Sequence, residues 1–109
     1  MTTVTIYKSN KDIYKGFTCK GHAGYKAFGK DIICASISIL VINTINSLEE
    51  LAGQEMDVKE DENTGYIDCR LTQECNEKSK LLLDSMILGL QCIVQQGGKK
   101  YLKLRFEEV

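Results

Sequence analysis

The sequence predicts an α+β fold with the order ββαββαβ, in which two helices pack on a mainly antiparallel sheet. Three observations lead to this prediction. Five short segments alternate apolar and polar residues, two longer segments repeat apolar residues every three or four positions, and turn-forming residues separate them. A chain of 109 residues has the length of one compact domain, so we expect 1–109 to share a single core.

The start of the chain has the pattern of two paired strands. Residues 3–9 place Val4 and Ile6 on one face and threonine and tyrosine side chains on the other. Residues 12–21 alternate again, and the SNKD segment at 9–12 has the composition of a turn. We therefore expect an antiparallel hairpin here.

From residue 33 the spacing of apolar residues changes to three and four, which predicts an amphipathic helix ending near Gly53. Residues 55–60 and 65–71 then have the alternation of strands, and the DENTG segment between them has turn composition. They predict a second hairpin. The apolar residues of the predicted helix are Ile37, Leu40, Val41, Ile45, Leu48 and Leu51.

The C-terminal third predicts a second helix and a last strand. Residues 75–96 carry a broad apolar stripe at helical spacing, and Gly97-Gly98 ends it. Residues 100–108 alternate as a strand. The apolar residues of that strand are Leu102, Leu104 and Phe106.

Composition excludes several classes of protein. The chain is 43% hydrophobic and 27% charged, which is ordinary for a globular protein, and its net charge of -1 does not favour direct nucleic-acid binding. No secretion signal is visible, and the apolar run at 37–42 is too short to span a membrane. We expect a cytoplasmic protein whose five cysteines are thiols.

One cysteine lies where a helix is predicted to begin. If Asp31 is the N-cap, Cys34 falls in the first turn, where a helix N-terminus lowers the pKa of a thiol. The backbone N–H groups of that turn can also stabilise an oxyanion. Ser38 follows one turn later on the same face. Residues 31–38 therefore have the chemistry of a nucleophile site.

The single histidine, His22, precedes this cysteine by twelve positions. A neutral imidazole can take the thiol proton and later protonate a leaving amine. Gly24 and Gly29 lie in the intervening segment, which could fold back over the thiol. The same residues also fit a buried structural thiol, a surface histidine and a plain turn, and Cys19 with His22 has the spacing of half a metal site.

The segment 21–40 resembles the ribosomal-processing cysteine proteases, the small Prp family of Firmicutes and related bacteria. The family pattern is a GHAGY segment, a glycine, and then a D-I-V-C-A segment with a serine four residues after the cysteine. In this chain Ile33 replaces the usual valine. The residues that carry the resemblance are Gly21, His22, Ala23, Gly24, Tyr25, Gly29, Asp31, Ile32, Ile33, Cys34, Ala35, Ser38 and Leu40.

The resemblance implies a cysteine endopeptidase with Cys34 as nucleophile and His22 as general base and acid. It implies that the substrate is the precursor of large-ribosomal-subunit protein number twenty-seven, whose N-terminal extension is removed during ribosome assembly. It also implies a homodimer that needs no metal or organic cofactor. From the charge and the apolar run lengths we expect no membrane partner and no direct contact with nucleic acid. Gly21, Asp31 and Ser38 are expected to support the site.

Several alternatives stay open at this point. Asp31 either orients the histidine or caps the helix. Tyr25 and Phe28 are candidates for contact with an extended, apolar peptide substrate, or else they pack within their own segment. A non-catalytic module that binds a ribosome-assembly protein is the alternative function. A redox sensor is another, and it would need Cys19 close to Cys34.

Overall fold

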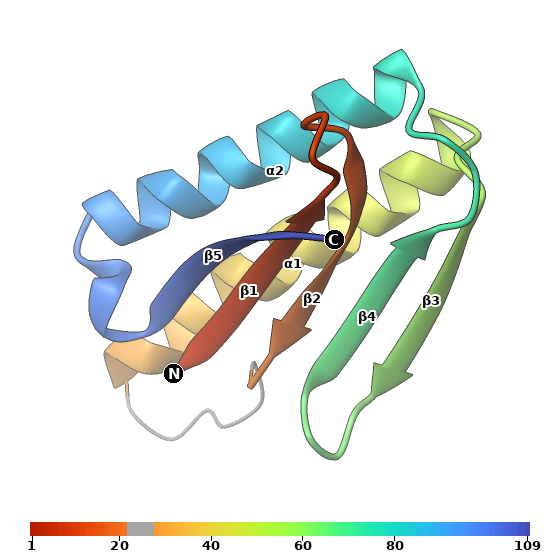
Figure 1. The fold of residues 1–109 in the computed structure, drawn as a ribbon. Coiled ribbons are helices and arrows are strands. Elements are labelled where there is room, and N and C mark those ends of the chain that lie inside the picture. The colour runs from red at the N-terminus through yellow and green to blue at the C-terminus, as the bar shows by residue number, and fades with distance from the viewer. Residues whose placement is uncertain (22–27) are drawn as a thin grey trace.

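A computed structural model describes residues 1–21 and 28–109 of the chain, and only the backbone of residues 28–31. The order of elements is ββαββαβ, as predicted, with one short 3-10 helix before the last strand (Figure 1). The strands are β1 Thr2–Lys8, β2 Tyr14–Lys20, β3 Met56–Asp61, β4 Tyr66–Leu71 and β5 Leu102–Glu108, and the helices are α1 Phe28–Glu50, α2 Glu77–Gln95 and η1 Gly98–Lys100.

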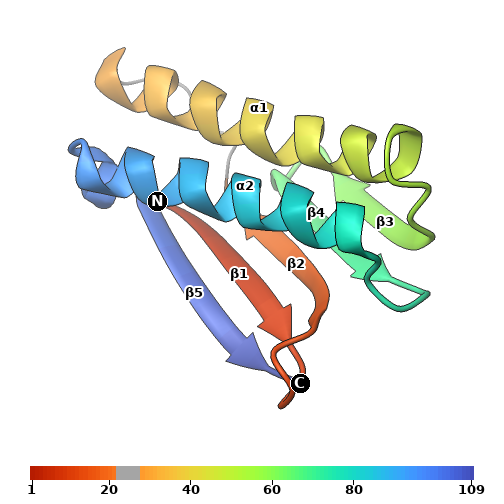
Figure 2. The same cartoon turned by 90° about the horizontal axis from the view of Figure 1, so that it is seen from above.

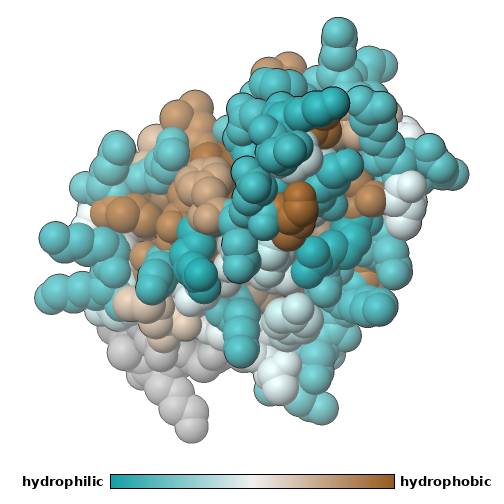
Figure 3. Space-filling model, viewed as in Figure 1, coloured by the Kyte–Doolittle hydropathy of each residue, from teal (hydrophilic) through white to brown (hydrophobic). Residues whose placement is uncertain are grey.

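The five strands form one mixed sheet in the order β3-β4-β2-β1-β5. The two predicted hairpins, β1 with β2 and β3 with β4, are both antiparallel, whereas β5 runs parallel to β1. Figure 2 shows both helices on the same face of this sheet. The opposite face and the surface around it are largely hydrophilic, with hydrophobic side chains gathered where α2 lies beside β5 (Figure 3). This one-sided burial explains the alternation in the sequence.

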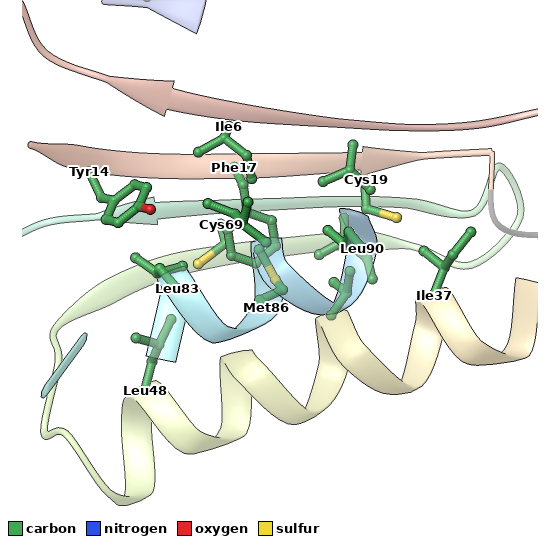
Figure 4. Packing of buried hydrophobic residues seen from close by; sticks show 14 of the residues in the cluster. Ile6, Tyr14, Phe17, Cys19, Ile37, Leu48, Cys69, Leu83, Met86 and Leu90 are labelled. Carbon is green, nitrogen blue, oxygen red and sulfur yellow. The ribbon is translucent and has the colours of Figure 1, made fainter. Parts of the chain in front are cut away.

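The core lies between the sheet and the two helices (Figure 4). Phe17 and Cys19 of β2 point from the sheet toward the helices, and Ile37 and Leu48 point from α1 toward the sheet. All four side chains are fully buried. Because the inner face of α1 is fixed by this packing, the position of every other residue on α1 is fixed with it.

Helix α1 is apolar on both faces. Its inner face is buried, but Ile32, Ile39 and Ile42 on other faces remain exposed. By length and composition the segment Ile32–Glu50 could cross a membrane, and 28% of it is buried in this structure. The packing of its inner face against the sheet accounts for part of this apolar character, and the exposed isoleucines need a separate explanation.

Two residues of the predicted apolar patterns lie outside the core. Leu51 follows the last residue of α1 and is exposed, because the chain turns away there toward β3. Phe106 is half-exposed near the end of β5, an edge strand, where its ring lies 5.9 Å from the Nζ atom of Lys8. Both errors have one cause: alternation and helical spacing continue past the point where the packed layers end.

A glycine sets the distance between the two helices. A Cβ atom at Gly89 of α2 would lie 3.0 Å from both terminal methyl carbons of Leu40 on α1. Such a contact is tighter than normal packing, so a larger residue would require the Leu40 side chain to shift. Gly89 thus makes room for Leu40, at the middle of α1, to pack against α2.

A buried glutamine joins the end of α1 to the start of α2. The Gln54 side chain is 5% exposed. Its Oε1 atom accepts a 2.7 Å hydrogen bond from the Ser79 hydroxyl and a 3.3 Å bond from the backbone N–H of Asn76. Its Nε2 atom donates to the carbonyl oxygen of Gln73 at 3.1 Å. Asn76 is itself the N-cap of α2, so one amide organises the whole connection.

Replacing this glutamine is expected to destabilise the fold. Gln54→Leu keeps the volume but leaves buried polar partners unpaired, and we expect the free energy of unfolding to fall by about 2 kcal/mol. Chemical denaturation would measure the change. Gln73→Leu is the matched control, because that side chain is exposed and only its backbone carbonyl takes part. Equal stability of the two variants would contradict the assigned role of Gln54.

Candidate active site

Helix α1 begins earlier than the sequence predicts. Its first residue is Phe28, so Asp31 is the fourth residue of the helix and not its N-cap. The prediction failed because glycine is typical of loops, so Gly29 was placed before the helix. In addition, Asp31 followed by an apolar run is typical of a helix start. The helix-capping role of Asp31 is therefore wrong.

This start moves Cys34 out of the first turn. Cys34 is the seventh residue of α1, and only the first four N–H groups of a helix lack an intrahelical acceptor. The effect of the helix dipole also falls off within the first turn. Cys34 therefore does not lie among the free first-turn amides of α1, as the predicted oxyanion hole required. The feature that distinguishes the Cys34 thiol is its placement on the inner face of α1.

Cys34 faces the sheet beside the end of β2. Its side chain is 1% exposed and lies one turn before Ile37 on the inner face of α1. Burial, and next the charge of the Cys34 thiolate, raise the pKa of Cys19 to about 12. Both thiols are buried, Cys34 on the inner face of α1 and Cys19 on the face of β2 that points toward the helices. Strand β2 leads directly to residue 22.

The chain leaves β2 through Gly21, one of the predicted supporting residues. Gly21 has a φ of 85°, and a Cβ atom there would lie 2.8 Å from the carbonyl oxygen of Met1. Its N–H donates to the carbonyl oxygen of Gly65 at 3.1 Å, and its carbonyl accepts from the Thr2 hydroxyl at 3.2 Å. Only glycine combines this backbone conformation with such a close approach. Gly21 therefore fixes the point from which residue 22 departs.

The structure describes only some of the other predicted site residues. His22 and Tyr25 lie outside the described residues. Phe28 and Asp31 are placed as backbone within α1, and their side chains lie outside the description. Ser38 is half-buried on α1, one turn after Cys34. The pairing of Cys34 with His22 therefore stays a prediction.

A groove that the sequence did not predict runs along an exposed face of α1. It has a volume of about 480 Å³. Its described lining comes from one face of α1, at spacings of three and four residues from Ala35 onward. The sequence did contain a signal for the groove. Ile39 and Ile42 are apolar although they do not lie on the inner face of the amphipathic helix. The lining residues are Ala35, Ser38, Ile39, Ile42, Asn43 and Asn46.

The remaining cysteines have ordinary structural environments. Cys69 is buried in β4 beside the sulfur of Met56, at 3.7 Å, and burial raises its pKa to about 12. Cys75 is half-buried and burial also raises its pKa. Cys92 is exposed on α2. None of these three thiols lies on α1 or beside the groove.

Comparison with known proteins agrees with this geometry. The family model described as cysteine protease Prp matches residues 1–103. The ribosomal processing cysteine protease Prp of Bacillus subtilis is 32% identical over 97 residues, which cover 85% of this chain and 87% of that protein.

Two solved structures of the Staphylococcus aureus ribosomal processing protease Prp have the same fold. The complex with a substrate peptide is 24% identical, covers 98% of this chain and 100% of its own, and has a TM-score of 0.90. The complex with a covalently linked product peptide is 26% identical at the same coverage, with a TM-score of 0.87.

The environments of three of the thiols predict their order of alkylation. We expect iodoacetamide at pH 8 to modify Cys92, which is exposed on α2, before the buried Cys19 and Cys69. The raised pKa of about 12 leaves roughly one in ten thousand of each of the latter thiols ionised at that pH. Mass spectrometry of digested samples would give the order. The same reaction in guanidinium chloride is the control, and modification of Cys19 or Cys69 as fast as Cys92 in the folded protein would contradict the prediction.

Proposed function

This chain belongs to the cysteine protease Prp family, and from that membership we propose the substrate and the roles of the site residues. The proposed substrate is the precursor of large-ribosomal-subunit protein number twenty-seven. The peptidase would remove its N-terminal extension, with Cys34 as nucleophile and His22 as general base and acid. This reaction would take place in the cytoplasm during ribosome assembly.

The burial of Cys34 on the inner face of α1, the face that packs on the sheet, is the observation that supports the assignment. Strand β2 belongs to that sheet, and it carries Cys19 on the face that points toward the helices. Only Lys20 and Gly21 separate Cys19 from His22 in the sequence. This supports a Cys34–His22 pair in the free enzyme or on substrate binding.

The proposed reaction is acyl transfer through a thioester. His22 takes the proton of Cys34, and the thiolate attacks the scissile carbonyl carbon. The C–N bond then breaks, and the imidazolium gives its proton to the amine that becomes the new N-terminus. The extension remains as a thioester on Cys34. A water molecule, deprotonated by His22, hydrolyses the thioester and regenerates the thiol.

We propose two kinds of role for the supporting residues: some position the catalytic groups, and others contact the substrate. With the capping role excluded, we propose that Asp31 orients His22. Gly21 sets the direction in which the chain enters the site. Tyr25 and Phe28 are proposed to contact substrate. Ser38 supports the site one turn beyond the nucleophile.

Membership of a protease family removes the main support for the alternative of a non-catalytic binding module. We also propose that the enzyme is a homodimer, as the family resemblance implies. The apolar stripe of α2 gives no support to this proposal, because Leu83, Met86 and Leu90 are buried in the core of one chain. Sedimentation equilibrium would test the dimer, and a monomer across the micromolar range would refute it.

Removal of either catalytic group should abolish cleavage. We expect Cys34→Ala and His22→Ala to lower the rate of cleavage of the full-length precursor by roughly 10³-fold or more, because the two groups act as a unit. Mass spectrometry would locate the cut and measure its rate. Cys92→Ala is the matched control, because that thiol is exposed on α2, and it should cleave at the wild-type rate.

The assignment fails if Cys34→Ala retains activity, or if folded and reduced wild-type protein leaves the precursor intact. A residual rate in His22→Ala that rises when imidazole is added would support the histidine as proton acceptor.

A further inference from the structure

We propose that Thr2 is a positioning residue for the reaction, because its hydroxyl orients the peptide unit from which His22 continues. This inference rests on the proposed peptidase function and deepens it, since it gives a residue outside the 21–40 segment a part in aligning the general base. The hydroxyl of Thr2 donates a 3.2 Å hydrogen bond to the carbonyl oxygen of Gly21. That carbonyl belongs to the peptide bond between Gly21 and residue 22.

The oxygen that Thr2 contacts is rigidly connected to the backbone that follows it. A peptide unit is planar, and it contains the carbonyl group of one residue together with the N–H group and the Cα atom of the next. A hydrogen bond to the Gly21 carbonyl oxygen therefore restrains the direction in which the chain enters His22. Only covalent bonds of the main chain lie between this restraint and the start of the histidine.

Gly21 needs such a restraint from outside. Glycine takes positive and negative φ values about equally readily, so its own preferences do not hold the φ of 85° that it has here. Its N–H donates a 3.1 Å hydrogen bond to the carbonyl oxygen of Gly65, just before β4. The Thr2 hydroxyl binds its carbonyl from the start of β1. The two bonds hold both polar groups of Gly21 from two different strands.

Thr2 is itself firmly held. It is 1% exposed, and its backbone N–H donates to the carbonyl oxygen of Tyr101 at 2.7 Å. It also pairs with Leu102, the first residue of β5. Figure 1 shows the starts of β1 and β4 and the end of β2 at the same end of the sheet. The restraint on Gly21 therefore comes from the edge of the ordered sheet.

A buried threonine can also serve stability alone, and the two roles predict different measurements. A buried hydroxyl without a partner destabilises a protein, so the bond to Gly21 contributes to folding in either case. A purely structural residue changes how much of the enzyme is folded. A positioning residue changes the rate of the chemical step in folded enzyme, because a general base must be aligned with the proton that it takes.

The first test compares two substitutions at one position in the full-length protein. Thr2→Val removes the hydroxyl and keeps the shape of the side chain. We expect it to lower kcat for the precursor by roughly 10-fold with KM unchanged, because alignment of the base matters in the transition state and not in binding. Thr2→Ser keeps the hydroxyl and should retain most of the wild-type kcat. Mass spectrometry would measure cleavage, and circular dichroism would give the folded fraction.

Thr5→Val is the matched control. Thr5 is a buried threonine of the same strand, 6% exposed, and it pairs with Thr18 and not with Gly21. The same exchange at this position should leave kcat unchanged. If Thr2→Val is too unstable to assay, Thr2→Ala and Thr2→Ser form a second pair. Both lack the methyl group and only the serine keeps the hydroxyl, so the serine variant should be the faster of the two.

Removal of the histidine shows whether Thr2 acts through it. In a His22→Ala background, cleavage followed over long incubations should be equally slow with and without Thr2→Val, because no general base remains to be aligned. Equal fold-losses in both backgrounds would overturn the proposal. So would a raised KM with unchanged kcat, or Thr2→Ser no faster than Thr2→Ala. If the wild type cleaves nothing, the peptidase function itself fails; if Thr2→Val cleaves as the wild type does, only the positioning role fails.

Discussion

The packing of the inner face of α1 on the sheet is the constraint on which the rest of the structure depends. Ile37, Val41 and Leu48 are fully buried there, and Cys34 lies in line with them. Because these contacts fix the rotation of the helix about its axis, they decide which residues face β2 and which face outward. The same packing therefore places a thiol beside the end of β2 and leaves a row of isoleucines on the outer surface.

The order of elements could be predicted from the sequence because each element buries one face. Strands β1 and β2 and helix α2 have apolar residues at the spacing that this burial requires. The start of α1 could not be predicted, because a glycine at position 29 is typical of a loop and an aspartate at position 31 is typical of an N-cap. The parallel pairing of β5 with β1 could not be predicted either, since pairing depends on contacts between the two ends of the chain.

The candidate site was predicted by its motif more than by its chemistry. Cys34 and His22 match the family pattern, whereas the favourable helix position assigned to the thiol was wrong. The groove was missed for a physical reason. In residues 32–48 almost every face of the helix is apolar, and an amphipathic pattern in such a segment cannot separate core residues from exposed apolar residues. Only the burial of each side chain separates Ile37 from Ile39.

The parallel pairing of β5 with β1 also matters for anyone who extends the chain. Parallel strands that are neighbours begin at the same end of the sheet and finish at the opposite end. Val109 therefore lies beside Lys8, while Met1 lies beside Gly21 (Figure 1). A tag or fusion partner joined ahead of Met1 would begin next to Gly21, where the chain leaves β2 toward the candidate site. One joined after Val109 would leave from the far edge, and that end is the better place for a purification handle.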